Sequence, residues 1–230
     1  MVSRHPGGKT KKSGRQIDLG EADALRIAEN HGVPVPHVYK VETDPDGLRH
    51  IWMDYIPGNT LGKIWDSLSE DEKKDIAKQL RAILEHMRSI PPPEAHIGSC
   101  EGRGVIDMRR YATEECPPCR DEKEFNDFLL SGILDGLPNM RSGLTQRLRT
   151  DHRVVFTHGD FRPSNIMVRD GKVVALLDFE AAGWYPEHWE YVKWFQRLGT
   201  DPRDWWRFMD DIFPEAYHDE FVDYVALSYF

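Results

Sequence analysis

The stretch HGDFRPSN at residues 158–165, followed by DFE at residues 178–180, contains the residues on which the interpretation of this sequence depends. Transfer of a phosphoryl group from a nucleotide needs a carboxylate beside the attacking hydroxyl and hard oxygen ligands that hold a divalent metal ion. A loop that carries Asp160 and then Asn165 places two oxygen-bearing side chains at one mouth of a site. A hairpin after this loop delivers Asp178 beside them, so the pattern predicts phosphoryl-transfer chemistry.

The elements around this stretch predict an α+β protein. Apolar periodicity, turn residues and a Ser-x-x-Glu capping box indicate strands first and mainly helices afterwards. We expect a strand end at Ile17–Leu19, a helix at Glu21–Asn30, strands at Val38–Glu42 and Leu48–Tyr55, a helix from Ser69 capped through Glu72, and strands at Val154–Phe156, Ile166–Arg169 and Val173–Asp178, the last two joined by a turn at Asp170-Gly171.

The loop and hairpin resemble two motifs of the aminoglycoside phosphotransferase family, which includes choline-kinase-like relatives: its HGDxxxxN motif and its second, metal-binding acidic motif. The resemblance extends over roughly residues 12 to 200, and its flanking segments include VPVP at 33–36, MDYIPG at 53–58 and GWYP at 183–186. It implies an α+β, protein-kinase-like two-lobed fold. Residues 1–57 would form an incomplete small β lobe with a hinge near 53–57, and residues 58–230 a larger, mainly helical C-terminal lobe.

The resemblance also implies roles for individual residues. Asp160 would be the catalytic base, and Asn165 and Asp178 would be magnesium ligands. Lys12, nine residues before Glu21, has a spacing similar to that of the family's lysine, which pairs with the nucleotide phosphates and with a glutamate of the following helix. The main chain of the hinge would contact adenine, at Met53, Asp54, Tyr55 and Ile56.

Other residues near the loop have open alternatives. We expect His158 to support the loop as a buried, hydrogen-bonded side chain. Arg162 either contacts phosphate or lies in solvent, and Glu180 either helps to hold a second metal ion or is an exposed acid. The sequence leaves both choices open. After the hairpin, four residues either line a substrate pocket or form the packed stripe of a helix, and the packed stripe is favoured: Glu187, Trp189, Glu190 and Trp194.

The start of the chain departs from the family pattern. Only eleven residues precede Lys12, whereas two strands and a glycine-rich turn over the phosphates need about 25 to 30. The segment around Lys12 is rich in Gly, Lys and Ser and has no β pattern. The sequence therefore predicts one of two functions. The first is transfer of the ATP γ-phosphate to a hydroxyl of a small molecule with Mg²⁺, and the alternative is a weak or inactive pseudo-phosphotransferase that keeps the fold.

Composition limits the partners. The net charge is −9, and because residues 1–17 carry five basic side chains and no acid, the remainder carries −14. An acidic body repels nucleic-acid phosphates, so we expect no nucleic-acid partner. The sequence lacks an apolar run of about 18–20 residues and a secretory signal, which predicts a cytoplasmic protein with no membrane partner.

Metal chemistry of another kind is disfavoured. The three cysteines include Cys116 and Cys119 in a CPPC stretch with redox or half-zinc-site spacing, but no second pair accompanies it, and a proline-stiffened loop is the favoured interpretation. A metal-dependent hydrolase that uses His158 and Asp160 as ligands needs further histidines near them, and the other nine are scattered.

Overall fold

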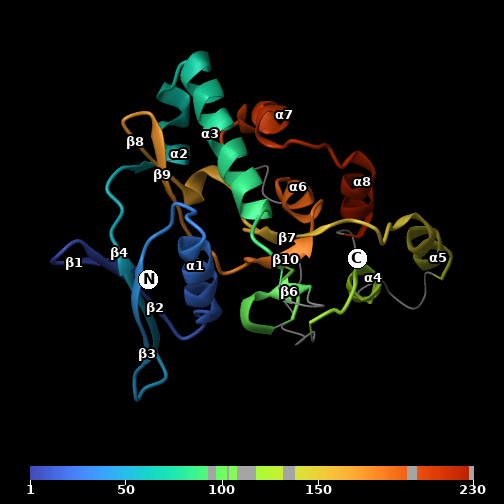
Figure 1. Ribbon diagram of the computed structural model, residues 1–230, viewed down its shortest axis with the longest axis horizontal. Coiled ribbons are helices and arrows are strands. Elements are labelled where there is room, and N and C mark those ends of the chain that lie inside the picture. The colour runs from blue at the N-terminus through green and yellow to red at the C-terminus, as the bar shows by residue number, and fades with distance from the viewer. Residues whose placement is uncertain (93–96, 103, 108–117, 132–137, 196–200, 228–230) are drawn as a thin grey trace.

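The computed structural model describes residues 1–92, 97–102, 104–107, 118–131, 138–195 and 201–227. A four-stranded sheet and one helix occupy one end of the molecule, and helices predominate at the other end (Figure 1). The α+β character predicted from the sequence is thus observed. The division into lobes at residues 57 and 58 stays a prediction. Among the helices of the described ranges, none is long and apolar enough to cross a membrane.

The N-terminal sheet is antiparallel and has the order β1-β2-β4-β3. Gly7 and Gly8, with φ of 76° and 71°, form the turn of the first hairpin, where left-handed backbone favours glycine. The strands are β1 (Val2–His5), β2 (Lys9–Gly14), β3 (Val38–Thr43) and β4 (Arg49–Asp54).

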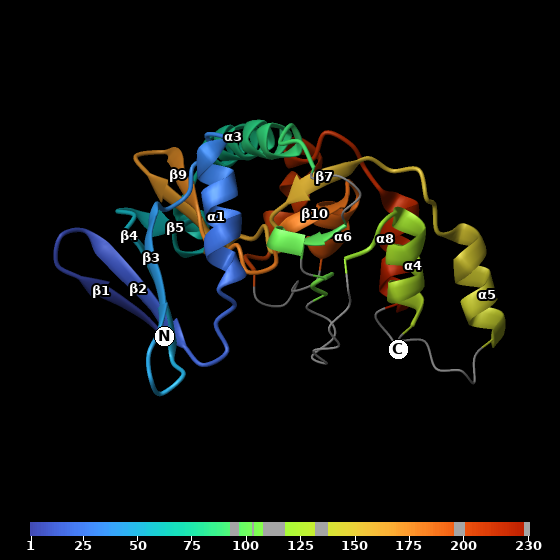
Figure 2. The same ribbon diagram turned by 60° about the horizontal axis from the view of Figure 1, so that its bottom comes forward.

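Two expectations about this region were wrong. The segment around Lys12 forms strand β2, although it lacks apolar alternation, because its backbone pairs with β4 from Lys9 opposite Asp54 to Gly14 opposite Arg49. Ile17–Leu19 is not a strand end but the approach to α1 (Gly20–Asn30). Helix α1 contacts β3 and lies beside the sheet (Figure 2).

A long helix follows the sheet. Helix α3 (Glu70–Arg88) begins at the predicted capping box, in which Ser69 Oγ accepts a hydrogen bond from the backbone N–H of Glu72, and Glu72 Oε2 accepts one from the backbone N–H of Ser69. Before it come β5 (Asn59–Thr60), α2 (Leu61–Ile64) and a 3₁₀ turn, Trp65–Ser67.

Two three-stranded sheets bring the motif residues together. One has the order β5-β8-β9 and the other β6-β10-β7. The turn at Asp170-Gly171 joins β8 to β9, as predicted, with φ of 51° and 71°. The HGD loop follows β7, and residues 178–180 follow β9. The strands are β6 (Gly98–Ser99), β7 (Val154–Thr157), β8 (Ile166–Arg169), β9 (Lys172–Leu176) and β10 (Gly183–Pro186).

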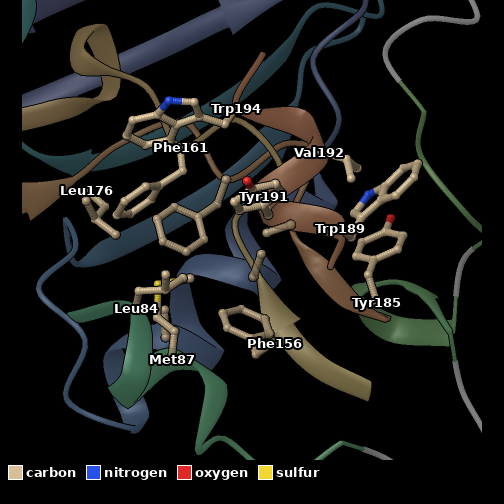
Figure 3. Close-up of a cluster of buried hydrophobic side chains, with 14 of the residues drawn as sticks. Leu84, Met87, Phe156, Phe161, Leu176, Tyr185, Trp189, Tyr191, Val192 and Trp194 are labelled. Atoms are coloured by element: carbon tan, nitrogen blue, oxygen red, sulfur yellow. The ribbon is translucent and has the colours of Figure 1, made fainter. Parts of the chain in front are cut away.

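The core between these elements is rich in aromatic residues. Figure 3 shows Leu84 and Met87 of α3 gathered with Phe156, Phe161 and Tyr191, and all five are buried. Burying side chains of this size contributes about 1.5–3 kcal/mol each before conformational entropy is subtracted. The remaining helices are α4 (Glu122–Leu130), α5 (Pro138–Arg147), α6 (Trp189–Lys193), α7 (Met209–Ile212) and α8 (His218–Leu227), with 3₁₀ turns at Cys100–Gly102, Pro163–Asn165 and Trp205–Phe208.

Candidate functional site

The imidazole ring of His158 connects the two segments that carry the predicted acidic residues. The backbone N–H of Asp160 donates to His158 Nδ1 at 3.1 Å, and His158 Nε2 lies 2.9 Å from the carbonyl oxygen of Leu177, the residue before Asp178. A carbonyl only accepts and an N–H only donates, so Nε2 carries the proton and the ring is neutral. His158 is fully buried. The prediction that it supports the loop is confirmed, and the ring holds the Asp160 and Asp178 segments next to each other.

Asn165 closes the loop onto Asp160. The amide nitrogen Nδ2 of Asn165 donates to the carbonyl oxygen of Asp160 at 3.0 Å and to its carboxylate Oδ2 at 2.8 Å. The backbone of Asn165 is tied to the hairpin, because the N–H of Leu177 donates to its carbonyl oxygen at 2.8 Å. The carboxylate of Asp160 is therefore oriented by an amide that also belongs to the predicted metal-binding pair.

The turn at Gly159 depends on glycine and on a buried acid. Gly159 has φ of +80°, and a Cβ there would lie 2.5 Å from the carbonyl oxygen of Ala181. Glu190, almost completely buried on α6, accepts hydrogen bonds from the backbone N–H groups of His158 at 2.6 Å and Gly159 at 3.0 Å. Burial raises the pKa of Glu190, although these two donors act in the opposite direction.

Lys12 lies at the centre of a second cluster. Its Nζ is 2.7 Å from Glu21 Oε2, 2.7 Å from Asp178 Oδ1 and 3.4 Å from Glu180 Oε2. Strand β2 supplies Lys12, α1 supplies Glu21, and the segment after β9 supplies the other two acids. The structure thus brings together one residue pair near the start of the chain and two acids about 160 positions later.

The charges in this cluster do not balance. Burial lowers the pKa of Lys12, but the carboxylates of Glu21 and Asp178 outweigh burial and hold this pKa above its ordinary value. Burial raises the pKa of Glu21 to about 7, against the lowering influence of Lys12.

Carboxylate oxygens of Glu21, Asp178 and Glu180 lie within 4.8 Å of one another. Three carboxylates around one ammonium leave an excess of negative charge. Hard oxygen donors with such an excess fit a divalent cation such as Mg²⁺.

The predicted hinge joins the sheet to the rest of the chain. The backbone N–H of Tyr55 donates to the carbonyl oxygen of Gly8 at 2.8 Å, and the N–H of Asp54 donates to that of His37 at 3.0 Å. Met53 is paired on both sides within the sheet, opposite residues of β2 and β3. Adenine contact by residues 53–56 stays a prediction, and it must use main-chain groups other than these two N–H groups.

The geometry bears on two of the open alternatives. Arg162 does not extend into solvent, because its guanidinium lies 2.9 Å from Asp201 and its side chain is 15% exposed. Trp189 and Glu190 of α6 are buried, as are Glu187 before the helix and Trp194 at its C-terminal end, so all four side chains are packed, although only two of them belong to the helix. Sequence reasoning did not recognise that Glu190 supports the HGD loop.

The structure gives little support to a metal-dependent hydrolase built on His158 or to a metal site at the CPPC stretch. His158 uses both ring nitrogens for backbone contacts, so it is not available as the ligand that a hydrolase would need. Cys116 lies outside the described residues. Cys119 is buried, and its backbone forms an isolated bridge with Ile97.

A lysine–glutamate pair supplied by a sheet and the helix beside it, next to an acidic loop and hairpin, is the arrangement of a protein-kinase-like phosphotransferase. The family model described as "Phosphotransferase enzyme family" matches residues 5–227, and the chain belongs to this family.

Among curated proteins, the chain is 22% identical over 215 residues to an aminoglycoside 3'-phosphotransferase of Streptomyces fradiae, covering 89% of this chain and 70% of that protein. It is 22% identical over 189 residues to one of Enterococcus faecalis, covering 76% of this chain and 65% of that protein. The chain therefore spans about two thirds of the length of these relatives.

Solved structures share the fold. The aminoglycoside phosphotransferase APH(4)-Ia superimposes with a TM-score of 0.67 at 13% identity, covering 99% of this chain and 78% of that one. A thermostable mutant of that protein, in a ternary complex with ADP and hygromycin B, gives a TM-score of 0.66 at 12% identity, covering 99% and 83%. APH(2'')-Ib with bound ADP gives 0.63 at 17% identity, covering 95% and 73%.

Proposed function

We propose that this protein transfers the γ-phosphate of ATP to a hydroxyl group of a small molecule. The observation that carries the proposal is the link between the two clusters: His158 joins the backbone of Asp160 to that of Leu177, and the next residue, Asp178, contacts Lys12. The two solved relatives that bind ADP share the fold, which supports a nucleotide substrate.

Each residue has a proposed role. Asp160 orients the acceptor hydroxyl and takes its proton, Lys12 binds nucleotide phosphate oxygens, and Glu21 holds Lys12 in place. The oxygens of Asn165 and Asp178 hold Mg²⁺, which, when bound, supplies charge neutralisation at the phosphates. Adenine would be bound by free main-chain groups of residues 53–56.

The proposed acceptor is a small molecule with a free hydroxyl group. The curated relatives are named for aminoglycosides, and one solved relative binds hygromycin B, so amino sugars are the first compounds to test. The acidic body of the chain is compatible with a cationic acceptor.

The test is a coupled assay of ADP formation with Mg-ATP and a panel of amino sugars, choline analogues and simple alcohols. With an acceptor that supports turnover, Asp160→Asn should lower kcat by roughly 10²–10⁴-fold. Asp46→Asn, in the exposed β3–β4 turn, is the matched control and should leave kcat unchanged. Equal turnover by Asp160→Asn and the unaltered protein would rule out the proposed base.

The same purified protein can be used to distinguish the enzyme from the alternative, a pseudo-phosphotransferase. Calorimetry with Mg-ATP measures nucleotide binding without any acceptor. Binding without turnover on the whole panel, or no binding at millimolar ATP, would favour the alternative over the enzyme.

A further inference from the structure

A second cluster of metal-ligating side chains lies at the other end of β7 from the HGD loop. Glu122 begins α4, His152 precedes β7, and His188 precedes α6. One ligand atom from each lies within 4.8 Å of the other two. His152 is six residues before His158, which along an extended strand is roughly 20 Å. The cluster is thus separate from the site proposed for phosphoryl transfer.

His188 provides the observation that points to a ligand. The residue is 8% exposed, and its Nδ1 atom is buried without a hydrogen-bond partner. Burying a polar nitrogen without a partner has a free-energy cost of about 1–3 kcal/mol. The nearest acid is Glu122, whose Oε1 lies 3.8 Å away, too far for a hydrogen bond. A cation between these two atoms would give His188 Nδ1 the partner that it lacks.

His152 faces a carboxylate at each of its two ring nitrogens. Its Nδ1 lies 2.6 Å from Glu122 Oε1, and its Nε2 lies 3.2 Å from Glu220 Oε1 on α8. Histidines that bind a metal through one nitrogen usually donate the other N–H to a carboxylate, which fixes the ring. Glu220 occupies the position of that carboxylate.

Charge and space around the cluster favour a cation. A cavity of about 170 Å³ is lined by His152, His188 and Glu220 together with further charged residues. This volume exceeds what one water molecule needs, so a water ligand can be accommodated. Acids outnumber bases in and around the cluster, four to two: Glu122, Asp219, Glu220 and Asp223 against Arg147 and Arg149.

We propose that Glu122, His152 and His188 bind one Zn²⁺ ion, with Glu220 fixing the ring of His152 and water from the cavity as the fourth ligand. Two imidazoles and one carboxylate are a ligand set that zinc prefers, whereas Mg²⁺ prefers oxygen ligands alone. Zinc–ligand bonds of about 2.0–2.1 Å separate tetrahedral ligand atoms by about 3.3 Å. The observed separations of 2.6 Å and 3.8 Å bracket this value.

Such an ion would tie α4 and α6 to the strand that leads into the HGD loop. Binding to the folded state alone stabilises it in proportion to the logarithm of ligand concentration. The expected role is structural, and it does not depend on the protein having phosphotransferase activity.

The test uses the full chain, freed of metal with EDTA and then titrated with Zn²⁺ or Co²⁺. We expect one equivalent to bind, visible d–d absorption of four-coordinate Co²⁺, and a melting temperature that rises with zinc concentration. His188→Leu, which keeps the side-chain volume, should abolish the Co²⁺ absorption and the shift in melting temperature. His37→Ala is the matched control, because His37 is an exposed histidine 2.8 Å from Glu29 and should change neither readout.

Glu220→Gln provides a second variant that leaves all three ligands in place. Loss of such a supporting carboxylate should weaken zinc binding roughly 10–100-fold. If His188→Leu does not fold, Glu220→Gln still tests the site. Unchanged affinity in Glu220→Gln, or no stoichiometric binding by the unaltered protein, would overturn the proposal.

The cysteines are the competing metal ligands. Thiolate ligation adds an intense near-ultraviolet charge-transfer band to the Co²⁺ spectrum, and imidazole and carboxylate ligation does not. A spectrum with that band, lost in Cys119→Ser and retained in His188→Leu, would place the ion elsewhere and refute the site. Absence of the band together with loss of binding in His188→Leu supports the site.

Discussion

The ammonium group of Lys12 lies 2.7 Å from the carboxylate of Asp178, although 166 positions separate them in the chain. In this arrangement the lysine contacts the same acid that we propose as a magnesium ligand. Binding of Mg-ATP would supply cations to Asp178 and phosphate oxygens to Lys12, so the contact marks where nucleotide phosphates would bind.

Replacement of Lys12 should therefore weaken nucleotide binding. Lys12→Met removes charge-assisted hydrogen bonds worth about 1.5–3 kcal/mol, which corresponds to a roughly 10- to 100-fold higher Kd for Mg-ATP. Lys11→Met is the control, because Lys11 is on the same strand but lies 5.0 Å above the ring of Trp52. Calorimetry on both variants measures the difference, and an equal Kd for the two would contradict the assignment of Lys12.

The strand that carries Lys12 shows the limit of prediction from the sequence. The Asp170-Gly171 hairpin and the Ser69 capping box were predictable because turn and cap residues act within a few positions. Strand β2 has no such local signal. It forms because its backbone pairs with β4, about 40 residues later in the chain, and because Lys11 packs on Trp52.

The same distinction applies to the candidate site. The motif spacing predicted that Asp160, Asn165 and Asp178 have oxygen atoms near one another, and the hydrogen bonds through His158 and Leu177 place their segments together. Glu190 was not predicted to support the HGD loop. It lies on α6, and the residues to which it is hydrogen-bonded are more than 30 positions away in the chain. An acid between aromatic residues in a sequence looks the same whether it caps a loop or lines a pocket.

Gly159 and Gly171 form a matched pair for testing the HGD loop. Both have positive φ, 80° and 71°, but a Cβ at Gly171 meets no atom within 4 Å, whereas one at Gly159 lies 2.5 Å from a backbone oxygen. Gly171→Ala should lower the free energy of unfolding by about 1–2 kcal/mol from backbone strain alone. Gly159→Ala should lower it by a further 1–3 kcal/mol or so, because the loop must shift to remove the overlap.

Urea unfolding measures both glycine variants. Losses of the same size would mean that Gly159 is required only for its backbone conformation and that the approach of Ala181 is not a constraint.

The tautomer of His158 can be observed directly. Because its ring accepts from Asp160 N–H and donates to the carbonyl of Leu177, we expect a neutral imidazole with the proton on Nε2. Nitrogen-15 chemical shifts of the ring distinguish this form from the Nδ1–H tautomer and from imidazolium. Two equivalent protonated nitrogens at pH 7 would show that the ring does not bridge these two backbone groups.

The contacts of Asp204 predict how stability changes with pH in the helical part of the molecule. Its carboxylate accepts hydrogen bonds from Trp65 Nε1 at 2.6 Å and from Lys73 Nζ at 2.8 Å. Partial burial raises the pKa of Asp204, but these two donors outweigh burial and hold the pKa below its ordinary value. Its contribution to the free energy of unfolding is therefore complete above the unfolded-state pKa of about 3.9 and is lost as pH falls through the lower folded-state pKa.

Asp204→Asn should accordingly be less stable than the unaltered protein by about 1–3 kcal/mol at pH 7, because Lys73, 9% exposed, loses its charged partner. At pH 3 the difference should be smaller, since this pH lies below the unfolded-state pKa of about 3.9 and the contribution of the carboxylate is then being lost. Asp66→Asn, an exposed neighbour of Trp65, is the control and should give the same free energy of unfolding as the unaltered protein at pH 7. Chemical denaturation at the two pH values measures whether the stability difference between Asp204→Asn and the unaltered protein becomes smaller at low pH. A difference that grows as the pH is lowered would mean that Asp204 is stabilised in its neutral form and that the ion pair with Lys73 does not govern its titration.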